Sequence, residues 1–171
     1  MTSQSLFQPI SVLVVDDSAY MRHLLLGLLH ALEVGEVFLA ANGEEGLDLY
    51  QRHVPDVVIT DAAMEPGDGF ELVKTLRAIN SAELSTAPII MVSGHTDVDS
   101  IERARDAGIT SFLSKPISAT SLYKRLAEAV CHPRAFIDTP TYRGPDRRRR
   151  DTPFNGVDRR QEHVVPQVAL I

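Results

Sequence analysis

The chain has 171 residues, of which 44% are apolar, and a formal net charge of −6. This length allows one domain with a full hydrophobic core and an additional segment. The single cysteine, Cys131, excludes an internal disulfide and a cysteine-based zinc framework, and it favours a reducing compartment. No apolar run is long enough to span a membrane, and the N-terminus does not resemble a signal peptide, so we expect a soluble, cytoplasmic protein.

Five short apolar runs alternate with amphipathic stretches in the first 131 residues. The predicted strands are 10–15, 37–41, 57–60, 89–92 and 111–114. The first amphipathic stretch places Met21, Leu25, Leu28, Leu29 and Leu32 at helical spacing, and further helices are predicted at 42–53, 69–83, 97–108 and 118–131. Most strands are continuously apolar, as strands covered on both faces are. The alternation predicts an α/β domain with a doubly wound parallel sheet.

Residues 132–171 have a different composition. Prolines become frequent, and residues 131–171 hold eight arginines against five acids, whereas residues 1–130 hold nine Lys and Arg against eighteen Asp and Glu. We therefore expect a short N-terminal extension at 1–9, one domain at 10–131, and an irregular tail at 132–171 that is extended or disordered.

Reactive side chains follow four of the five predicted strands. Asp16 and Asp17 follow the first strand, Asp61 the third, Ser93 the fourth and Lys115 the fifth. Taken singly, each has a simpler explanation as a helix cap, a loop residue or a surface charge. The carboxyl ends of parallel strands meet at one edge, however, and three carboxylates gathered there repel each other unless a cation intervenes. An acidic site made of oxygen ligands suits Mg²⁺.

Such a site supports phosphoryl transfer. Mg²⁺ and Lys115 would neutralise charge on the transferring oxygens, and the hydroxyl of Ser93 would donate a hydrogen bond to one of them. The product would be an acyl phosphate on Asp61.

Residues 10–130 resemble the receiver domain of bacterial two-component response regulators. Four segments carry the resemblance in the family's order and spacing: "VLVVDDSAYMR", "VVITDAAMEPGDGFELV", "PIIMVSGH" and "SFLSKPIS". It implies a flavodoxin-like (βα)5 fold with strand order 2-1-3-4-5, an order taken from the family's chemotaxis receiver and not from the residues.

The resemblance also implies ligands for the metal and the phosphoryl donor. Asp61 would accept a phosphoryl group from a histidine kinase or a histidine phosphotransfer protein. Asp16, Asp17, Asp61 and the backbone carbonyl of Ala63 would hold Mg²⁺. Lys115 would pair with the phosphoryl oxygens, and its peptide bond to Pro116 would be cis.

Ser93 and Phe112 occupy the family's switch positions, although the sequence alone favours an ordinary core role for Phe112 at its strand position. Phosphorylation would shift the population between two packings by adding about two negative charges. The output face would comprise the fourth helix, fifth strand and fifth helix, including Ile101, Arg105, Phe112 and Tyr123. Whether phosphorylation changes the oligomeric state is left open.

The loop after Asp61 departs from the family pattern. Glu65 stands where proline is usual, and Pro66 follows one residue later. The local turn and the metal affinity are therefore open. Ala63 and His95 occupy positions that tune phosphate lifetime in the family: a small Ala63 leaves room for water, whereas His95 would screen or orient it. The lifetime is not predicted.

The tail contains the pattern Gly-x-Asp-Arg-Arg twice, at 144–148 and 156–160. Three hypotheses stand: a solvated disordered tail, a segment that docks on a partner or back on the acidic receiver, and a nucleic-acid or membrane contact. The candidate anchors for docking are Phe136, Tyr142, Phe154 and the terminal "VVPQVALI". The chain has no helix-turn-helix pattern, so we expect no sequence-specific DNA binding.

The prediction is a stand-alone response regulator that catalyses only its own phosphorylation and dephosphorylation and acts through protein contacts. One alternative is a scaffold or phosphate sink. Another is a Mg²⁺-dependent phosphohydrolase of the haloacid dehalogenase type. That family has Asp-x-Asp after the first strand and usually a cap domain, whereas here the two acids are adjacent.

Overall fold

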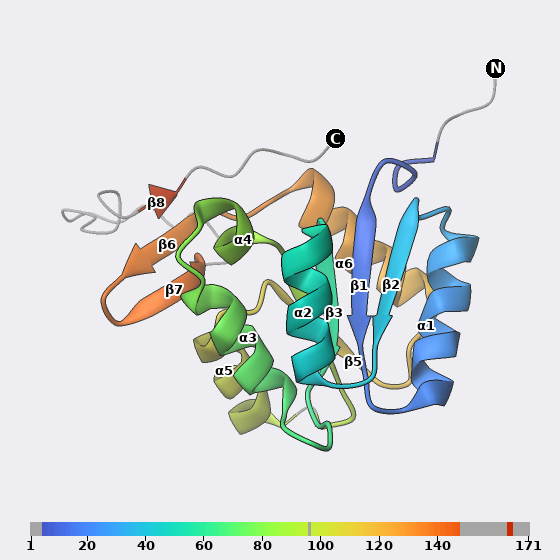
Figure 1. Ribbon diagram of the computed structural model, residues 1–171, viewed down its shortest axis with the longest axis horizontal. Helices are drawn as coiled ribbons and strands as arrows, with labels where there is room; N and C mark the ends of the chain where they lie inside the picture. The colour runs from blue at the N-terminus through green and yellow to red at the C-terminus, as the bar shows by residue number, and fades with distance from the viewer. Residues whose placement is uncertain (1–4, 96, 148–163, 166–171) are drawn as a thin grey trace.

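A parallel sheet of five strands forms the centre of the molecule (Figure 1). The computed structural model describes residues 5–95, 97–147 and 164–165. The strands are β1 (Ser11–Val15), β2 (Glu36–Ala40), β3 (Val57–Asp61), β4 (Ile89–Ser93) and β5 (Ser111–Ser114). Their order is β2-β1-β3-β4-β5, which confirms the predicted doubly wound, flavodoxin-like topology.

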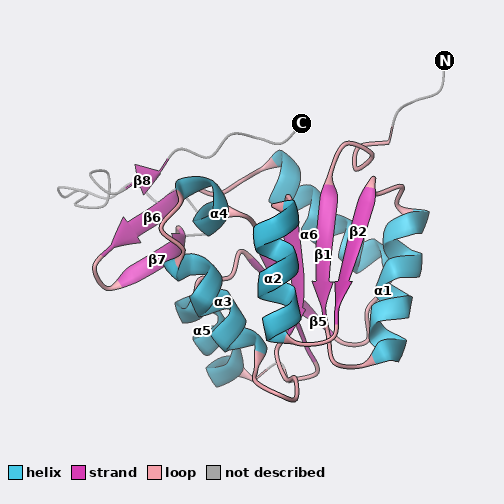
Figure 2. Ribbon diagram, in the orientation of Figure 1, coloured by secondary structure: helices cyan, strands magenta, loops and turns pink. Residues whose placement is uncertain are grey.

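The described residues form six helices, which connect and cover these strands (Figure 2). They are α1 (Ala19–Ala31), α2 (Gly43–His53), α3 (Gly69–Ala78), α4 (Ala82–Thr86), α5 (Val98–Ala107) and α6 (Ala119–Cys131). The single helix predicted at 69–83 is wrong: it is divided into α3 and α4. The reason is Ser81, which has extended backbone angles and whose hydroxyl accepts the N–H of Leu84, so that a new helix begins there.

Apolar side chains form a separate core on each face of the sheet. On one face, Leu25 and Leu29 of α1 pack with Leu122 and Leu126 of α6. On the other face, the core includes residues of α2, α3 and α5. None of the helices that the structure describes has the length and apolar character needed to span a bilayer.

The N-terminal extension contributes to the first of these cores. Phe7 is 1% exposed and belongs to the core cluster of α1 and α6. Its ring meets Tyr123 of α6 edge to face, with 5.4 Å between the ring centroids. The folded unit therefore begins before residue 10.

Part of the predicted irregular tail is a paired β-hairpin. Strands β6 (Phe136–Thr139) and β7 (Tyr142–Pro145) are antiparallel, and β8 (Val164–Val165) pairs with the other side of β6. The described part of the tail thus forms hydrogen-bonded strands, and Phe136 in it is fully buried. The candidate anchor Phe154 lies outside the described residues, as does most of the terminal "VVPQVALI".

Two glycines allow the hairpin to approach the turn between α5 and β5. Gly108 ends α5 with φ +99°, in the left-handed region. A Cβ atom on Gly108 would lie 2.6 Å from the carbonyl oxygen of Arg143, and one on Gly144 would lie 2.8 Å from the Cα of Gly108. Any larger residue at either position would push the hairpin off the receiver.

A buried arginine of α3 contacts the hairpin. Arg77 of α3 is 3% exposed. Its guanidinium donates to the carbonyl oxygens of Gly108 at 2.9 Å, Ser85 at 2.7 Å and Ala87 at 2.8 Å, and it faces the ring of Phe136. Burial lowers the pKa of Arg77 to about 10, which leaves it charged at neutral pH.

Candidate functional site

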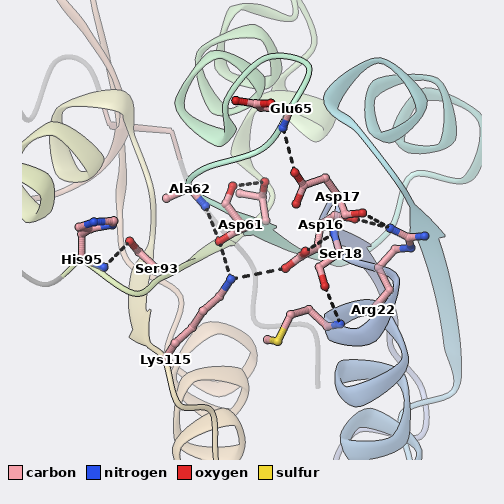
Figure 3. A network of polar contacts seen from close by, with 12 residues as sticks. Asp16, Asp17, Ser18, Arg22, Asp61, Ala62, Glu65, Ser93, His95 and Lys115 are labelled. Carbon is pink, nitrogen blue, oxygen red and sulfur yellow. Dashed lines mark hydrogen bonds and ion pairs between the residues drawn. The ribbon is translucent and has the colours of Figure 1, made fainter.

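Three carboxylates meet at the carboxyl edge of the sheet (Figure 3). Asp16 follows β1 and Asp61 is the last residue of β3, and both are buried, whereas Asp17 is exposed. One carboxylate oxygen from each lies within 4.8 Å of the other two. The strand register that places β1 beside β3 therefore brings together the three acids that the sequence had predicted to cluster.

Each carboxylate is oriented by a backbone amide. These amides donate from Ser18 to Asp16 Oδ1 at 2.8 Å, from Glu65 to Asp17 Oδ2 at 3.0 Å, and from Ala62 to Asp61 Oδ1 at 3.0 Å. The hydroxyl of Ser18 caps α1 by accepting the N–H of Met21, so Asp17 is not the cap. The side chain of Asp17 is therefore available as a ligand.

Arg22 approaches the acids without neutralising them. Its guanidinium donates to the backbone carbonyl oxygens of Asp16 at 2.6 Å and Asp17 at 3.1 Å, and not to their carboxylates. It holds the β1–α1 loop in place. This contact could not be predicted from the sequence, because an arginine on the first turn of a helix is usually a solvated surface residue.

Lys115 is the cation that reaches the carboxylates. Its Nζ lies 3.1 Å from Asp61 Oδ1 and 3.8 Å from Asp16 Oδ2 (Figure 3). One ammonium faces three carboxylates, so among the described residues the site has excess negative charge. Lys115 precedes Pro116 through a cis peptide bond, which confirms that prediction.

The carboxylate of Asp16 provides the clearest test of whether the site fits a cation. Its Oδ2 is buried and accepts no hydrogen bond from the described residues. Burial raises the pKa of Asp16 above its ordinary value, and the charges of Asp61 and Asp17 add to this, whereas the Ser18 N–H and Lys115 oppose it. A hard divalent cation would satisfy this oxygen and stabilise the ionised form, so the residues present fit Mg²⁺.

Ser93 lies beside Lys115 at the end of β4. Its carbonyl oxygen accepts the N–H of Lys115 at 2.9 Å, and its hydroxyl accepts the N–H of His95 at 3.0 Å. Because the preceding residue, Val92, pairs with Asp61 in the sheet, Ser93 is adjacent to the phosphoacceptor candidate. The hydroxyl proton of Ser93 remains available to a ligand.

The unusual Glu65–Pro66 loop stays attached to the site. The amide of Glu65 binds Asp17, as described above, and Ala63 forms an isolated β-bridge with Asp68. The N–H of Gly69 donates to Ala62 at 3.0 Å, and a Cβ atom on Gly69 would lie 1.9 Å from the carbonyl oxygen of Asp61. The displaced proline therefore leaves the loop close to the carboxylates.

Phe112 is half-buried on β5 and packs against the edge of the α2, α3 and α5 core. Two other residues of the expected output face, Ile101 and Tyr123, are 40% and 45% exposed. The aromatic ring thus lies at the boundary between core and surface. This position fits both the ordinary core role and the switch position.

The chain matches known proteins over this domain. The sequence model of the response regulator receiver domain matches residues 12–127. The transcriptional regulatory protein PdtaR of Mycobacterium tuberculosis is 34% identical over 122 residues, covering 71% of this chain and 57% of PdtaR. An uncharacterised 14.6 kDa protein of Leptolyngbya boryana is 34% identical over 120 residues, covering 70% of this chain and 88% of that protein.

Solved structures give the same result. The chemotaxis protein CheY4 of Vibrio cholerae superposes with a TM-score of 0.66 at 32% identity, covering 70% of this chain and 98% of CheY4. The chain spans little more than half the length of PdtaR, and the match to the family model ends at residue 127, before the hairpin. From the fold, the acidic edge and these matches, the chain belongs to the response regulator receiver domain family of two-component signalling.

Proposed function

We propose that this protein is a cytoplasmic response regulator, whose Asp61 accepts a phosphoryl group from a histidine kinase or a histidine phosphotransfer protein. The observation that carries the proposal is the position of the Asp61 carboxylate. It lies at the end of a buried strand, within 3.1 Å of the ammonium of Lys115 and beside two further carboxylates. This combination supports nucleophilic attack on phosphorus by a carboxylate oxygen.

Asp16, Asp17, Asp61 and the carbonyl of Ala63 would hold Mg²⁺, which when bound supplies positive charge to the phosphoryl oxygens. An oxygen of Asp61 forms the bond to phosphorus as the bond to the donor histidine breaks. The ammonium of Lys115 moves from its pair with Asp61 to a phosphoryl oxygen, and the hydroxyl of Ser93 donates to another. The protein catalyses no reaction on another substrate in this scheme.

Phosphorylation would be communicated through Ser93 and Phe112. Movement of the Ser93 hydroxyl toward the phosphoryl group would vacate space at the end of β4, and Phe112 would turn inward from its half-buried position. The readout is a protein partner that contacts the face of α5, β5 and α6. Coupling of this kind requires only that the two packings differ by a few kcal/mol.

The test is incubation of the full chain with Mg²⁺ and acetyl phosphate as the phosphodonor. We expect an acyl phosphate that is labile to both acid and alkali, that is absent from Asp61→Ala and that does not form when EDTA removes the metal. Asp48→Asn, which removes an exposed carboxylate of α2, is the matched control and should be phosphorylated normally. A wild-type chain that carries no labile phosphate would refute the proposal.

A further inference from the structure

A basic groove lies between α5, β5, α6 and the end of the hairpin. Its volume is about 640 Å³. Four cations line it, Arg105, Lys124, Arg125 and Arg147, together with the apolar side chains of Ile101 and Phe112. No carboxylate lines it among the described residues, although the whole chain carries a net charge of −6. Three of these cations pair with carboxylates outside the lining, Arg105 and Arg147 with Asp106 and Arg125 with Glu128. All three pairs are exposed and therefore weak, so the lining remains basic on a net acidic chain.

A second groove has an acidic lining, so the basic lining is specific to the first groove. The groove between the start of α2 and the β3–α3 loop has a volume of about 430 Å³. Glu44, Asp68 and Glu71 line it, and no Lys or Arg does so among the described residues. The two grooves would select segments of opposite charge.

Arg147 comes from the tail and not from the receiver. It follows β7, and its guanidinium carbon lies 3.9 Å from the ring centroid of Tyr142. Its Nη2 lies 3.3 Å from Asp106 Oδ1 at the end of α5. Stacking on Tyr142 fixes the direction of the guanidinium, whereas the exposed pair with Asp106 is weak and leaves the charge available to a ligand.

The hairpin that carries Arg147 is fixed to the receiver at several points. Phe136 is buried against Arg77, Gly144 packs on Gly108, and the guanidinium of Arg134 donates to Glu128 of α6 at 3.0 Å. Arg147 is thus held beside α5 as a wall of the groove.

Phe112 lies between this groove and the hairpin. It lines the groove and also lines a smaller cavity, of about 60 Å³, whose opposite wall is formed by Tyr142 and Pro145 of the hairpin. A change in the position of its ring alters both spaces. The groove is therefore placed where phosphorylation would change its shape.

We propose that this groove binds an acidic segment of a partner protein that also presents an apolar side chain, and that Arg147 of the tail is a specificity-determining residue for it. The inference rests on the proposed function, since it names the partner chemistry of the output face. The cations attract the acidic side chains, and the apolar side chain packs on Ile101 and Phe112. Nucleic acid is disfavoured because it offers no aliphatic anchor for the apolar floor and the chain is net acidic.

The test is selection of random 12-residue peptides displayed on phage against the full chain, with Mg²⁺ and beryllofluoride as the phosphoryl analogue. We expect selected peptides rich in Asp and Glu with an apolar residue. Their dissociation constant, measured by fluorescence anisotropy, should rise about tenfold in Arg147→Glu and about threefold or less in Arg147→Lys. Arg52→Glu, the same charge reversal on α2, is the matched control and should leave binding unchanged.

Each other outcome overturns the inference. It fails if no peptides are enriched, if the enriched peptides are neutral or basic, if Arg147→Glu binds as the wild type does, or if a 20-nucleotide DNA displaces the peptides. An unchanged thermal midpoint for Arg147→Glu shows that the variant is folded. Phosphorylation of Asp61 is measured on the same samples. A chain that takes no phosphate but binds acidic peptides through Arg147 would refute the proposed function and keep the groove.

Discussion

The guanidinium of Arg77 faces the ring of Phe136, with 5.5 Å between its Cζ and the ring centroid. Arg77 belongs to the receiver and Phe136 to the tail, so this contact makes the hairpin part of the folded domain. The ring covers a cation that has given up water for three backbone carbonyls. Loss of the ring would open the cation to solvent and leave a cavity behind it.

Phe136→Ala should therefore lower the free energy of unfolding by about 3 kcal/mol, the usual cost of deleting a buried aromatic ring. Urea unfolding followed by circular dichroism measures it. Thr141→Ala, at the exposed turn of the same hairpin, should change stability by less than about 0.5 kcal/mol. Equal, small effects of the two substitutions would show that the hairpin does not dock on the receiver.

Two glycine-to-alanine substitutions should have opposite signs. At Gly69 the new Cβ would lie 1.9 Å from the carbonyl oxygen of Asp61, so Gly69→Ala should destabilise the protein by about 2 kcal/mol and slow phosphorylation. At Gly27, inside α1, no atom lies within 4 Å, so Gly27→Ala should stabilise by about 1 kcal/mol through helix propensity alone. A neutral Gly69→Ala would contradict the close approach of α3 to Asp61.

Replacement of Asp17 by Asn should weaken Mg²⁺ binding at least tenfold, or about 1.4 kcal/mol, in isothermal titration calorimetry. The fold should remain, because the Asn side-chain oxygen can still accept the N–H of Glu65, and Ser18 provides the cap of α1. Asp48→Asn, with the same loss of charge, should bind Mg²⁺ normally. Unchanged Mg²⁺ affinity in Asp17→Asn would remove Asp17 from the ligand set.

Glu128 should contribute a pH-dependent part of the stability. Burial raises the pKa of Glu128, but the hydrogen bonds from Arg134 and Arg125 outweigh burial and hold the pKa below its ordinary value of 4.5. The folded state therefore binds fewer protons than the unfolded state in acid. The contribution is present above the unfolded pKa and is lost as pH falls through the folded pKa.

Glu128→Gln should accordingly cost about 0.5 kcal/mol at pH 7, since the side chain of Glu128 is 36% exposed and solvent screens its charge, and nothing near pH 2. Unfolding curves at the two pH values measure the difference. A cost that is equal at both would assign the effect to packing instead of charge.

The sequence predicted the site better than the tail, for physical reasons. Strand ends in a parallel sheet are fixed by the apolar runs, so Asp16, Asp61 and Lys115 could be placed together before any contact was known. Phe136 and Tyr142 could be named from the sequence as candidate anchors on the receiver, but the strand pairing of the hairpin and the contact of Phe136 with Arg77 of α3 depend on long-range packing that no local pattern predicts.

The break between α3 and α4 was missed for a related reason. The stretch from 69 to 83 has continuous helical spacing, and the Ser81 cap competes with it only weakly in sequence. Buried Arg77, which binds the carbonyls of Ser85 and Ala87, supports the break that the Ser81 cap begins. Contacts made by backbone atoms, such as the hydrogen bond from the amide of Glu65 to Asp17, cannot be inferred from residue types.

Buried Phe7 and Phe136 contribute to the stability of the fold but lie outside the segment that holds the phosphoryl site. Both rings are among its largest fully buried side chains, and both lie outside residues 12–127, which match the family. A module of family length transplanted into another protein would carry every candidate ligand of the phosphoryl site and neither of these rings. The family match therefore contains the whole candidate site, whereas the folded unit extends beyond this match at both ends.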